Sequence, residues 1–304
     1  MKHQHQHILL TGGSGLLGTE LTRILLDKGY TVSHLSRKPR HNARVKTYIW
    51  DIGKGEIDEN CINGVTIIIH LAGAGIAEKR WTDKRKKELI ESRTKSIGLI
   101  YDLLKRKPHQ VKRVLSASAT GYYSDGWDEL LTEDSAPAPD FLGQCCVAWE
   151  QAVDEGAELG LNILKFRTGV VLTRKGGALP KLAMPVKLSI GSPLGNGRQW
   201  IPWIHHADVT GMYIFGIEHF TLTGVYNMVA PHPVTNAQLT KAVAKQLKRL
   251  LWAPKVPAFL LKLLLGEMAI VILGSTRVSA GKIEQAGFTF RYPDIETALK
   301  EIYG

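Results

Sequence analysis

The stretch that decides the fold is Thr11-Gly12-Gly13-Ser14-Gly15-Leu16-Leu17-Gly18. It follows the short apolar run 8–11 and opens the segment 16–26, whose apolar residues recur at helical spacing. In such a strand–turn–helix unit, Gly12 permits the tight turn, Gly15 lets the backbone approach a pyrophosphate, and Gly18 lets the helix pack on the strand. The pyrophosphate then lies on the free N–H groups of the helix N-terminus. This context predicts a dinucleotide-binding site rather than a merely glycine-rich turn.

Strands and helices alternate along the first half of the chain. Short apolar runs predict strands, and longer segments with apolar residues at helical spacing predict helices. The later strands are expected at 31–35, 65–71, 113–117 and 161–166, and the helices at 83–106 and 142–159. The alternation predicts an α/β fold with a doubly wound parallel sheet of the Rossmann type.

The character of the chain changes after Gly169. Glycine and proline crowd the segment 176–197, and helical patterns dominate from 236 to the end. We expect an NADP-binding Rossmann domain and a smaller, mostly helical substrate domain. The first covers 1–172 with 204–230 returning to it, and the second covers 173–203 and 231–304.

The end of the second strand predicts which dinucleotide is bound. An NAD site usually places Asp or Glu there, against the ribose hydroxyls. Here the strand runs into Ser36-Arg37-Lys38, with no acid. Arg37 can form paired hydrogen bonds to a 2′-phosphate, Lys38 adds charge, and Ser36 adds a hydrogen bond. The pattern predicts NADP(H), with Asp51 after the next strand as an adenine contact; the alternative is that Arg37 and Lys38 are only surface loop residues.

The composition is that of a globular protein with a positive field. The 304 residues are 44% hydrophobic and carry a net charge of +11. The excess at 84–87 and 105–107 lies in or beside predicted helix without a nucleic-acid-binding motif, so we expect no nucleic-acid partner. The apolar segment 259–273 is short for a bilayer span, no signal peptide is evident, and three cysteines without a CxxC motif suit a reducing compartment. These features predict a cytoplasmic protein with no membrane contact and no metal.

Four segments resemble the extended, epimerase-type branch of the short-chain dehydrogenase/reductase superfamily. They are the TGxxGxxG spacing at 11–18, His70-Leu71-Ala72-Gly73-Ala74, Ser116-Ala117-Ser118-Ala119-Thr120-Gly121-Tyr122, and Trp203-Ile204-His205-His206-Ala207-Asp208-Val209. A narrower resemblance is to the group named epimerase family protein, which ends in a small domain of unknown function. It rests on Arg80-Trp81, Glu91-Ser92-Arg93, Trp149-Glu150, 176–179, 195–200 and 274–278, and spans Ile8 to Tyr303.

The chain departs from that resemblance at the catalytic pair. Typical members carry Tyr-x-x-x-Lys on the helix after the serine strand, where the tyrosine exchanges a proton and the lysine lowers its pKa and holds the nicotinamide ribose. With Trp149-Glu150 as the anchor, these positions fall on Leu142 and Cys146. Leucine has no proton to exchange, and a thiol near neutral pH is largely uncharged. The resemblance implies that Ser118 orients a substrate carbonyl without its usual partner.

Three replacements for the missing proton donor remain as alternatives. They are Tyr122 or Tyr123 from the loop after the serine, His205 or His206 near neutral pH, and Cys145 or Cys146 as a nucleophile. For each of them the competing interpretation is packing or a structural role. We take Ser118, Tyr122 and His205 as the catalytic candidates.

The remaining site predictions concern arginines that could bind anionic groups and tryptophan rings that could stack on a substrate. Arg93, Arg167 and Arg198 are candidates to clamp a phosphate or carboxylate, with a structural ion pair as the alternative. Trp200 and Trp203 are expected to form a stacking wall for the substrate beside Arg198, or else to be core. The predicted cofactor-binding residues are Gly12, Gly13, Ser14, Gly15, Leu16, Leu17, Gly18, Ser36, Arg37, Lys38, Asp51, Leu71, Ala72, Gly73, Ala74, Arg93, Ser116, Ala117, Ser118 and Arg167.

Two functions follow from these features. The first is an NADP-dependent oxidoreductase or nucleotide-sugar-epimerase-like enzyme acting on a small anionic or nucleotide-bearing substrate. The second is a non-catalytic protein that senses NADP(H), which fits a cofactor cradle without a proton-transfer pair. The resemblance also implies, as one arrangement beside a monomer, a homodimer formed through 83–106 and 142–159.

Overall fold

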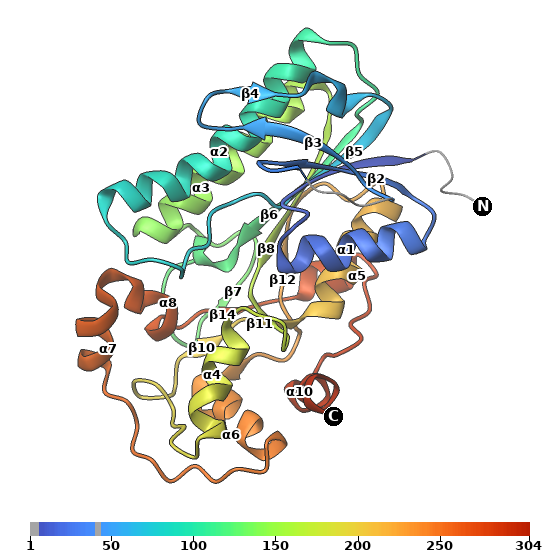
Figure 1. Cartoon of the computed structure of the whole chain (residues 1–304). Coiled ribbons are helices and arrows are strands. Elements are labelled where there is room, and N and C mark those ends of the chain that lie inside the picture. Colours follow the sequence, from blue (N-terminus) through green and yellow to red (C-terminus); the bar gives the residue numbers. More distant parts are fainter. Residues whose placement is uncertain (1–5, 40–43) are drawn as a thin grey trace.

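An eight-stranded sheet forms the centre of the protein (Figure 1), whose computed structural model describes residues 6–39 and 44–304. The strand order is β12-β8-β6-β5-β1-β2-β3-β4, and every neighbouring pair is parallel except β3 and β4. Its strands are β1 (His7–Thr11), β2 (Thr31–Ser36), β3 (Lys46–Asp51), β4 (Glu56–Ile57), β5 (Val65–His70), β6 (Arg113–Ala119), β8 (Asn162–Thr168) and β12 (Gly224–Met228). The predicted doubly wound α/β fold is confirmed.

Helices cover both faces of the sheet, as parallel connections require. One face carries α1 (Leu16–Asp27) and α5 (His206–Glu218), and the other carries α2 (Asp83–Arg106) and α3 (Phe141–Asp154) (Figure 1). Leu21 and Leu25, about one helical turn apart on α1, are buried against the first face. Hydroxyl and carboxylate caps start the helices of the second face, since Thr82 accepts the N–H of Arg85 and Asp140 accepts that of Gly143.

The later elements form a second group, lower in Figure 1. Its helices are α4 (Ala178–Lys187), α6 (Asn236–Gln246), α7 (Ala258–Leu265), α8 (Ile270–Leu273) and α10 (Ile295–Tyr303). Helix α9 (Gly281–Gln285) instead packs on β12, with Ile283 in the core of the first face. Three short strand pairs form separate two-stranded sheets: β9 (Val170–Leu172) with β11 (Trp203–His205), β10 (Trp200–Ile201) with β13 (Val234–Thr235), and β7 (Leu130–Leu131) with β14 (Arg277–Val278). Leu179, Val243 and Leu299 belong to a core cluster separate from the two on the sheet faces. The division into two domains at 172 stays a prediction.

Most element boundaries differ from expectation by one or two residues, and two of the differences bear on the site. The helix predicted over 142–159 ends at Asp154 and continues as a tighter 3-10 turn, Glu155–Leu159, which closes at the left-handed Gly160. Strand β6 runs two residues past the predicted 117, to Ala119, so Ser118 lies inside a strand. None of the described helices has the length and apolarity needed to cross a membrane.

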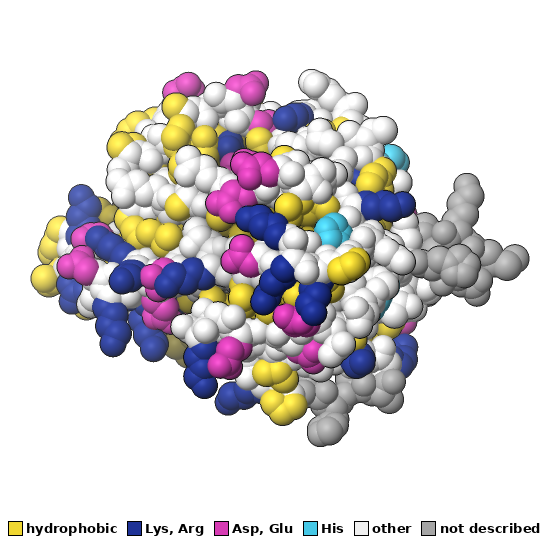
Figure 2. Space-filling view, turned by 90° about the horizontal axis from the view of Figure 1, so that it is seen from above, with side chains coloured by type: hydrophobic (Ala, Val, Ile, Leu, Met, Phe, Trp, Pro, Cys, Tyr) yellow, Lys and Arg dark blue, Asp and Glu magenta, His cyan; other side chains and the backbone are white. Residues whose placement is uncertain are grey.

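The basic segments of α2 lie among acidic side chains. Lys107 pairs with Glu59 at 2.8 Å, and Lys95 pairs with Glu91 at 2.9 Å. Figure 2 shows Lys and Arg side chains interleaved with Asp and Glu on the face seen from above, rather than gathered in one unbroken patch. This arrangement fits a solvated helix surface, which is the interpretation favoured for these charge runs.

Candidate cofactor and substrate site

The glycine turn between β1 and α1 is in close contact with the end of β5. Gly12 has a φ of 70°, and a Cβ there would lie 2.8 Å from the carbonyl oxygen of Leu71. A Cβ at Gly18 would collide with the carbonyl oxygen of Gly12, so α1 packs directly on the turn. Gly15 is exposed and caps α1, which leaves the first N–H groups of the helix at the surface for an anion. The turn therefore fits a pyrophosphate.

The segment 71–74 after β5 forms the opposite wall. The Thr11 hydroxyl accepts the N–H groups of Leu71 at 3.1 Å and Ala72 at 3.0 Å. The Ser92 hydroxyl of α2 accepts the N–H of Ala74 at 3.0 Å. These bonds hold the segment beside the turn, at the point where the strand order reverses between β1 and β5.

Together these elements enclose a cleft of about 270 Å³, which we call the cofactor cleft. Its lining comprises Gly12, Gly13, Ser14, Gly15, His34, Leu35, Ser36, Arg37, Trp50, Ile52, Leu71, Ala72, Gly73, Ala74, Glu88 and Ser92. Arg37 is exposed at the end of β2, where no acid stands. The lining acid Glu88 comes from α2 and pairs with Arg85 at 2.8 Å; this hydrogen bond lowers the pKa of Glu88. The cleft thus presents a basic lip at the position where an NAD site places a carboxylate.

Several predicted cofactor contacts lie elsewhere. Asp51 accepts the N–H groups of Gly53 and Lys54 in the β3–β4 turn, so its neighbours Trp50 and Ile52 line the cleft in its place. Leu16 and Leu17 line a small cavity on the other side of α1, and Lys38 is not part of the lining. Ser116 is fully buried, with its hydroxyl bonded to the carbonyl of Ala117 and to His70, and neither Ser116 nor Ala117 reaches the cleft.

A second pocket, of about 280 Å³, lies at the carboxyl ends of β6 and β8. Its lining comprises Ile76, Arg93, Ala119, Thr120, Gly121, Tyr123, Asp125, Asp140, Leu142, Cys145, Cys146, Trp149, Thr168, Gly169, Val170, Trp200, Ile201, Pro202, Ile270, Val271, Gly274 and Thr276. Leu142 and Cys146, which occupy the tyrosine and lysine positions of the family pattern, both belong to it. The two positions of the family's proton-transfer pair thus lie at the second pocket, and neither holds a tyrosine or a lysine.

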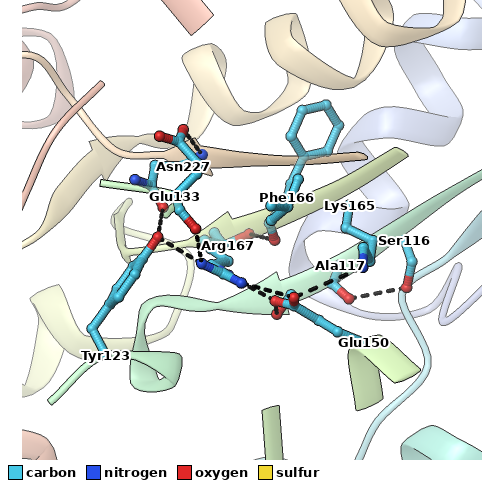
Figure 3. Close-up of polar contacts among 12 residues, drawn as sticks. Ser116, Ala117, Tyr123, Glu133, Glu150, Lys165, Phe166, Arg167 and Asn227 are labelled. Atoms are coloured by element: carbon cyan, nitrogen blue, oxygen red, sulfur yellow. Dashed lines mark hydrogen bonds and ion pairs between the residues drawn. The ribbon is translucent and has the colours of Figure 1, made fainter. Parts of the chain in front are cut away.

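Arg167 belongs to a buried network with Glu150 and Tyr123 next to this pocket (Figure 3). Ser118 joins this network through Glu150. The Ser118 hydroxyl donates to Glu150 Oε1 at 2.6 Å, and Ser118 is absent from the lining. Arg167 donates from Nε and Nη2 to the two oxygens of Glu150 at 2.9 and 3.0 Å. Burial alone would lower the pKa of Arg167, but the hydrogen bonds and charge of Glu150 outweigh it and raise the pKa. These contacts do not support two predictions: the Ser118 hydroxyl is bonded to Glu150, and Arg167 is paired with Glu150 and lies outside the lining of both pockets.

The tyrosines after the serine strand support the same network. The Tyr122 ring lies against the guanidinium of Arg167, 3.4 Å from its Cζ, and Tyr122 is not part of the pocket lining. Tyr123 lines the pocket, but its hydroxyl is bonded to Arg167 and Asn227, and burial raises its pKa to about 12. The catalytic prediction for Tyr122 is therefore not supported, because its ring packs on an arginine.

His205 is also structural. Its ring is fully buried, Nε2 is hydrogen-bonded to Glu301 at 2.8 Å, and Nδ1 accepts the N–H of Ala207. Burial, aided by the neighbouring His206, lowers the pKa of His205 to about 4, so the ring is neutral at pH 7. Among the described residues, one group of three possible metal ligands comes together. The ligand atoms of His205, His206 and Glu301 all lie within 4.8 Å of one another. Because Nδ1 of His205 accepts a hydrogen bond, Nε2 carries the proton of the neutral ring and offers a metal no lone pair.

Of the predicted substrate contacts, only Trp200 lines the second pocket. Its Nε1 donates to Asp128 at 2.7 Å, which fixes the ring at the pocket wall. Trp203 is fully buried and donates to the carbonyl of His232, so it is core. Arg198 is exposed and lies outside the lining. The thiols of Cys145 and Cys146 line the pocket, but burial raises the pKa of Cys145 and raises that of Cys146 to about 12, so both stay protonated at pH 7.

Residues outside the predicted set complete both sites. Trp50, Glu88 and Ser92 line the cofactor cleft, and the segment 270–276 covers the second pocket. No motif marks Trp50, Glu88 or 270–273. Ser92 and 274–276 belong to segments that carry the family resemblance, but nothing in those segments assigns them to a site.

A glycine turn at the reversal point of a doubly wound sheet, with a second pocket at the neighbouring strand ends, defines an extended short-chain dehydrogenase/reductase. The chain belongs to the NAD dependent epimerase/dehydratase family, whose model matches residues 8–228. Residues 256–302 match a domain of unknown function, DUF1731. The resemblance seen in the sequence is confirmed on both counts.

Similar proteins span the whole chain. Epimerase family protein YfhF of Bacillus subtilis is 35% identical over 298 residues, which is 97% of each chain. The crystal structure of human epimerase family protein SDR39U1 with NADPH has a TM-score of 0.86 and 30% identity, covering 98% of this chain and 99% of that one. A nucleoside-diphosphate sugar epimerase from Corynebacterium glutamicum has a TM-score of 0.81 and 31% identity, covering 98% of this chain and 58% of that one.

Proposed function

We propose that this chain binds NADP(H) in the cofactor cleft and acts as an oxidoreductase or epimerase-like enzyme. The observation that carries the proposal is the lip of the cleft, where Ser36 and Arg37 stand at the end of β2 without an acid. A guanidinium matches a 2′-phosphate in charge and geometry, and nothing there matches the two ribose hydroxyls of NAD. The NADPH in the similar human protein supports the same choice.

The two pockets suggest how cofactor and substrate would share the site. The adenine half would lie between the glycine turn and Trp50, and the nicotinamide half would reach the second pocket. When bound, the nicotinamide supplies the hydride chemistry. The chain's own part is to position the two reactants and exclude water, with the apolar side chains of Leu142, Trp149 and Ile270 around them. A small anionic or nucleotide-bearing substrate is the class we propose, with the Trp200 ring at the wall of this pocket.

The experiment that tests cofactor choice is a fluorescence titration with NADPH and NADH, on the wild-type chain and Arg37→Ala. We expect tighter binding of NADPH, and a loss of about 10- to 100-fold in NADPH affinity in the variant, because a charge-assisted hydrogen bond contributes about 1.5–3 kcal/mol. Arg106→Ala, which removes an exposed arginine that pairs with Glu59, is the matched control. Equal affinity for both cofactors in the wild-type chain would reject the assignment of NADP(H).

One observation favours a second function, the non-catalytic sensor. Leu142 has no proton to exchange, the neutral thiol of Cys146 supplies no positive charge, and both residues stand at the pocket wall. Single-turnover consumption of NADPH, followed by its fluorescence with a panel of small carbonyl compounds, separates the two functions. An oxidoreductase consumes NADPH with at least one compound of the panel, whereas a sensor binds NADPH and consumes none. An epimerase-like enzyme returns the hydride and consumes no net NADPH, so it is detected instead as interconversion of nucleotide-sugar epimers by the cofactor-loaded chain. A homodimer through α2 and α3 stays a prediction.

A further inference from the structure

Arg93 lies where the two pockets meet. On α2, Ser92 lines the cofactor cleft and Arg93 lines the second pocket. The guanidinium is in contact with the wall of the cleft, because a Cβ at Gly73 would lie 3.2 Å from its Cζ. Its Nη2 donates to the carbonyl of Ala74 at 3.0 Å. A dinucleotide that runs from one pocket into the other has to pass this side chain.

No carboxylate of the described residues pairs with Arg93. Its Nη1 donates to the carbonyl of Leu89 at 2.8 Å, and its Cζ lies 4.9 Å from the centre of the Trp149 ring. Burial lowers the pKa of Arg93, which means that the charge is held without full compensation. Arg167 on β8 differs from Arg93, because its guanidinium donates two hydrogen bonds to the carboxylate of Glu150, which balances its charge. A half-buried cation that lacks a counter-ion and keeps further N–H donors is suited to bind an anion.

The position that should carry the family's cation is close by. Cys146 of α3 stands where the lysine is expected, lines the same pocket as Arg93, and is near enough for the charge of Arg93 to act on its thiol. Helices α2 and α3 lie side by side on one face of the sheet (Figure 1). A cation on α2 can therefore reach the ligand that a lysine on α3 would otherwise hold.

We propose that Arg93 holds the nicotinamide half of the dinucleotide, by donating to its ribose hydroxyls and adjacent phosphate in place of the missing lysine. The inference rests on the proposed binding of NADP(H) and adds a second, separate anchor to it. Arg37 holds the adenine half through the 2′-phosphate, and Arg93 holds the other half. Because Leu142 has no hydroxyl whose pKa a cation could lower, Arg93 acts as a positioning residue.

Two ligands separate the anchors. NADPH carries both halves, whereas adenosine 2′,5′-bisphosphate carries the adenine half with its 2′-phosphate and no nicotinamide. We expect Arg93→Met to weaken NADPH binding by about 10- to 100-fold, as for loss of a charge-assisted hydrogen bond, and to change binding of the bisphosphate by less than about twofold. Arg93→Lys should recover part of the NADPH affinity. Arg37→Ala should weaken both ligands, and Arg106→Met, the same substitution on the same helix, should weaken neither.

The outcomes are distinguishable. If Arg93→Met binds NADPH as the wild-type chain does, Arg93 is structural and the inference is wrong. If the variant loses both ligands to the same extent, Arg93 acts on the adenine half or on folding, and the inference is again wrong. If the wild-type chain binds neither ligand, the proposed function fails and this inference fails with it. Binding of the bisphosphate to Arg93→Met also reports that the variant is folded.

Discussion

The cofactor cleft and the second pocket are built in different ways. The cleft is made largely of short stretches of backbone, 12–15, 35–37 and 71–74, and its shape depends on glycines that let chains approach closely. The second pocket draws side chains from residue 76 to residue 276, and it rests on the buried network of Glu150 and Arg167. The cleft is therefore sensitive to added atoms, and the pocket to unbalanced charge.

The largest effect on stability should follow from removing the negative charge of Glu150, next to the second pocket. Glu150→Gln leaves the guanidinium of Arg167 buried without its counter-ion, so we expect a loss of about 3–5 kcal/mol in the free energy of unfolding. Urea denaturation measures this loss. The control is Glu91→Gln on α2, whose ion pair with Lys95 lies at the surface, so its loss should change the free energy of unfolding little. Similar losses in the two variants would show that the network does not support the pocket as described.

An added methyl group in the glycine turn should disrupt the cofactor cleft. In Gly18→Ala the new Cβ meets the carbonyl oxygen of Gly12, and a backbone atom in a tight turn cannot move aside cheaply. We expect a loss of about 3 kcal/mol in stability, the upper end of overpacking costs, together with loss of NADPH binding. Gly98→Ala on α2, where a Cβ meets nothing within 4 Å, is the matched control and should change neither quantity adversely. An NADPH affinity unchanged in Gly18→Ala would contradict the assignment of the turn.

The same contrast explains which parts of the site could be predicted from sequence. The glycine turn and the end of β2 are contiguous stretches whose chemistry depends on residue type and order. The close contacts of Gly12 and Gly18 could therefore be predicted from the sequence alone, and the role of Arg37 at the 2′-phosphate stays a prediction. The fold could be predicted for the same reason, since each strand and helix carries its own periodicity.

The second pocket could be predicted only in outline. The motif located Ser118, but side chains alternate along a strand, and the partner that turns its hydroxyl away, Glu150, lies 32 residues further on. For Arg167 the sequence left a clamp and an ion pair as alternatives, and only the approach of Glu150 decides between them. The covering segment 270–276 could not be placed at the pocket from the sequence, although 274–276 carries part of the family resemblance, because its place depends on how distant parts of the chain pack.

A smaller effect, on the pH dependence of stability, is expected at His70, which lies at the boundary between the two sites. This histidine ends β5, directly before the wall of the cofactor cleft, and its ring meets the edge of Trp149 in the second pocket. It is fully buried between the hydroxyls of Ser96 and Ser116, at 2.7 and 3.1 Å. Burial, aided by the charge of Arg93, lowers its pKa to about 3, so the folded chain keeps the ring neutral at pH 5.

The sign of the pH dependence follows from that lowered pKa. An unfolded histidine takes up a proton as the pH falls through about 6.5, whereas the folded one does so only near 3, so stability is full above pH 6.5 and decreases as the pH falls from there. At up to about 1.4 kcal/mol per pH unit, His70 should account for a loss of about 2 kcal/mol between pH 7 and pH 5. His70→Gln keeps hydrogen-bonding groups for both serines and removes the titration. Urea denaturation at the two pH values should therefore show a loss about 2 kcal/mol smaller in the variant than in the wild-type chain, while the share due to His205 remains. An equal loss in both proteins would mean that the ring gains its proton in the folded state, and that the boundary between cleft and pocket is less dry than its burial indicates.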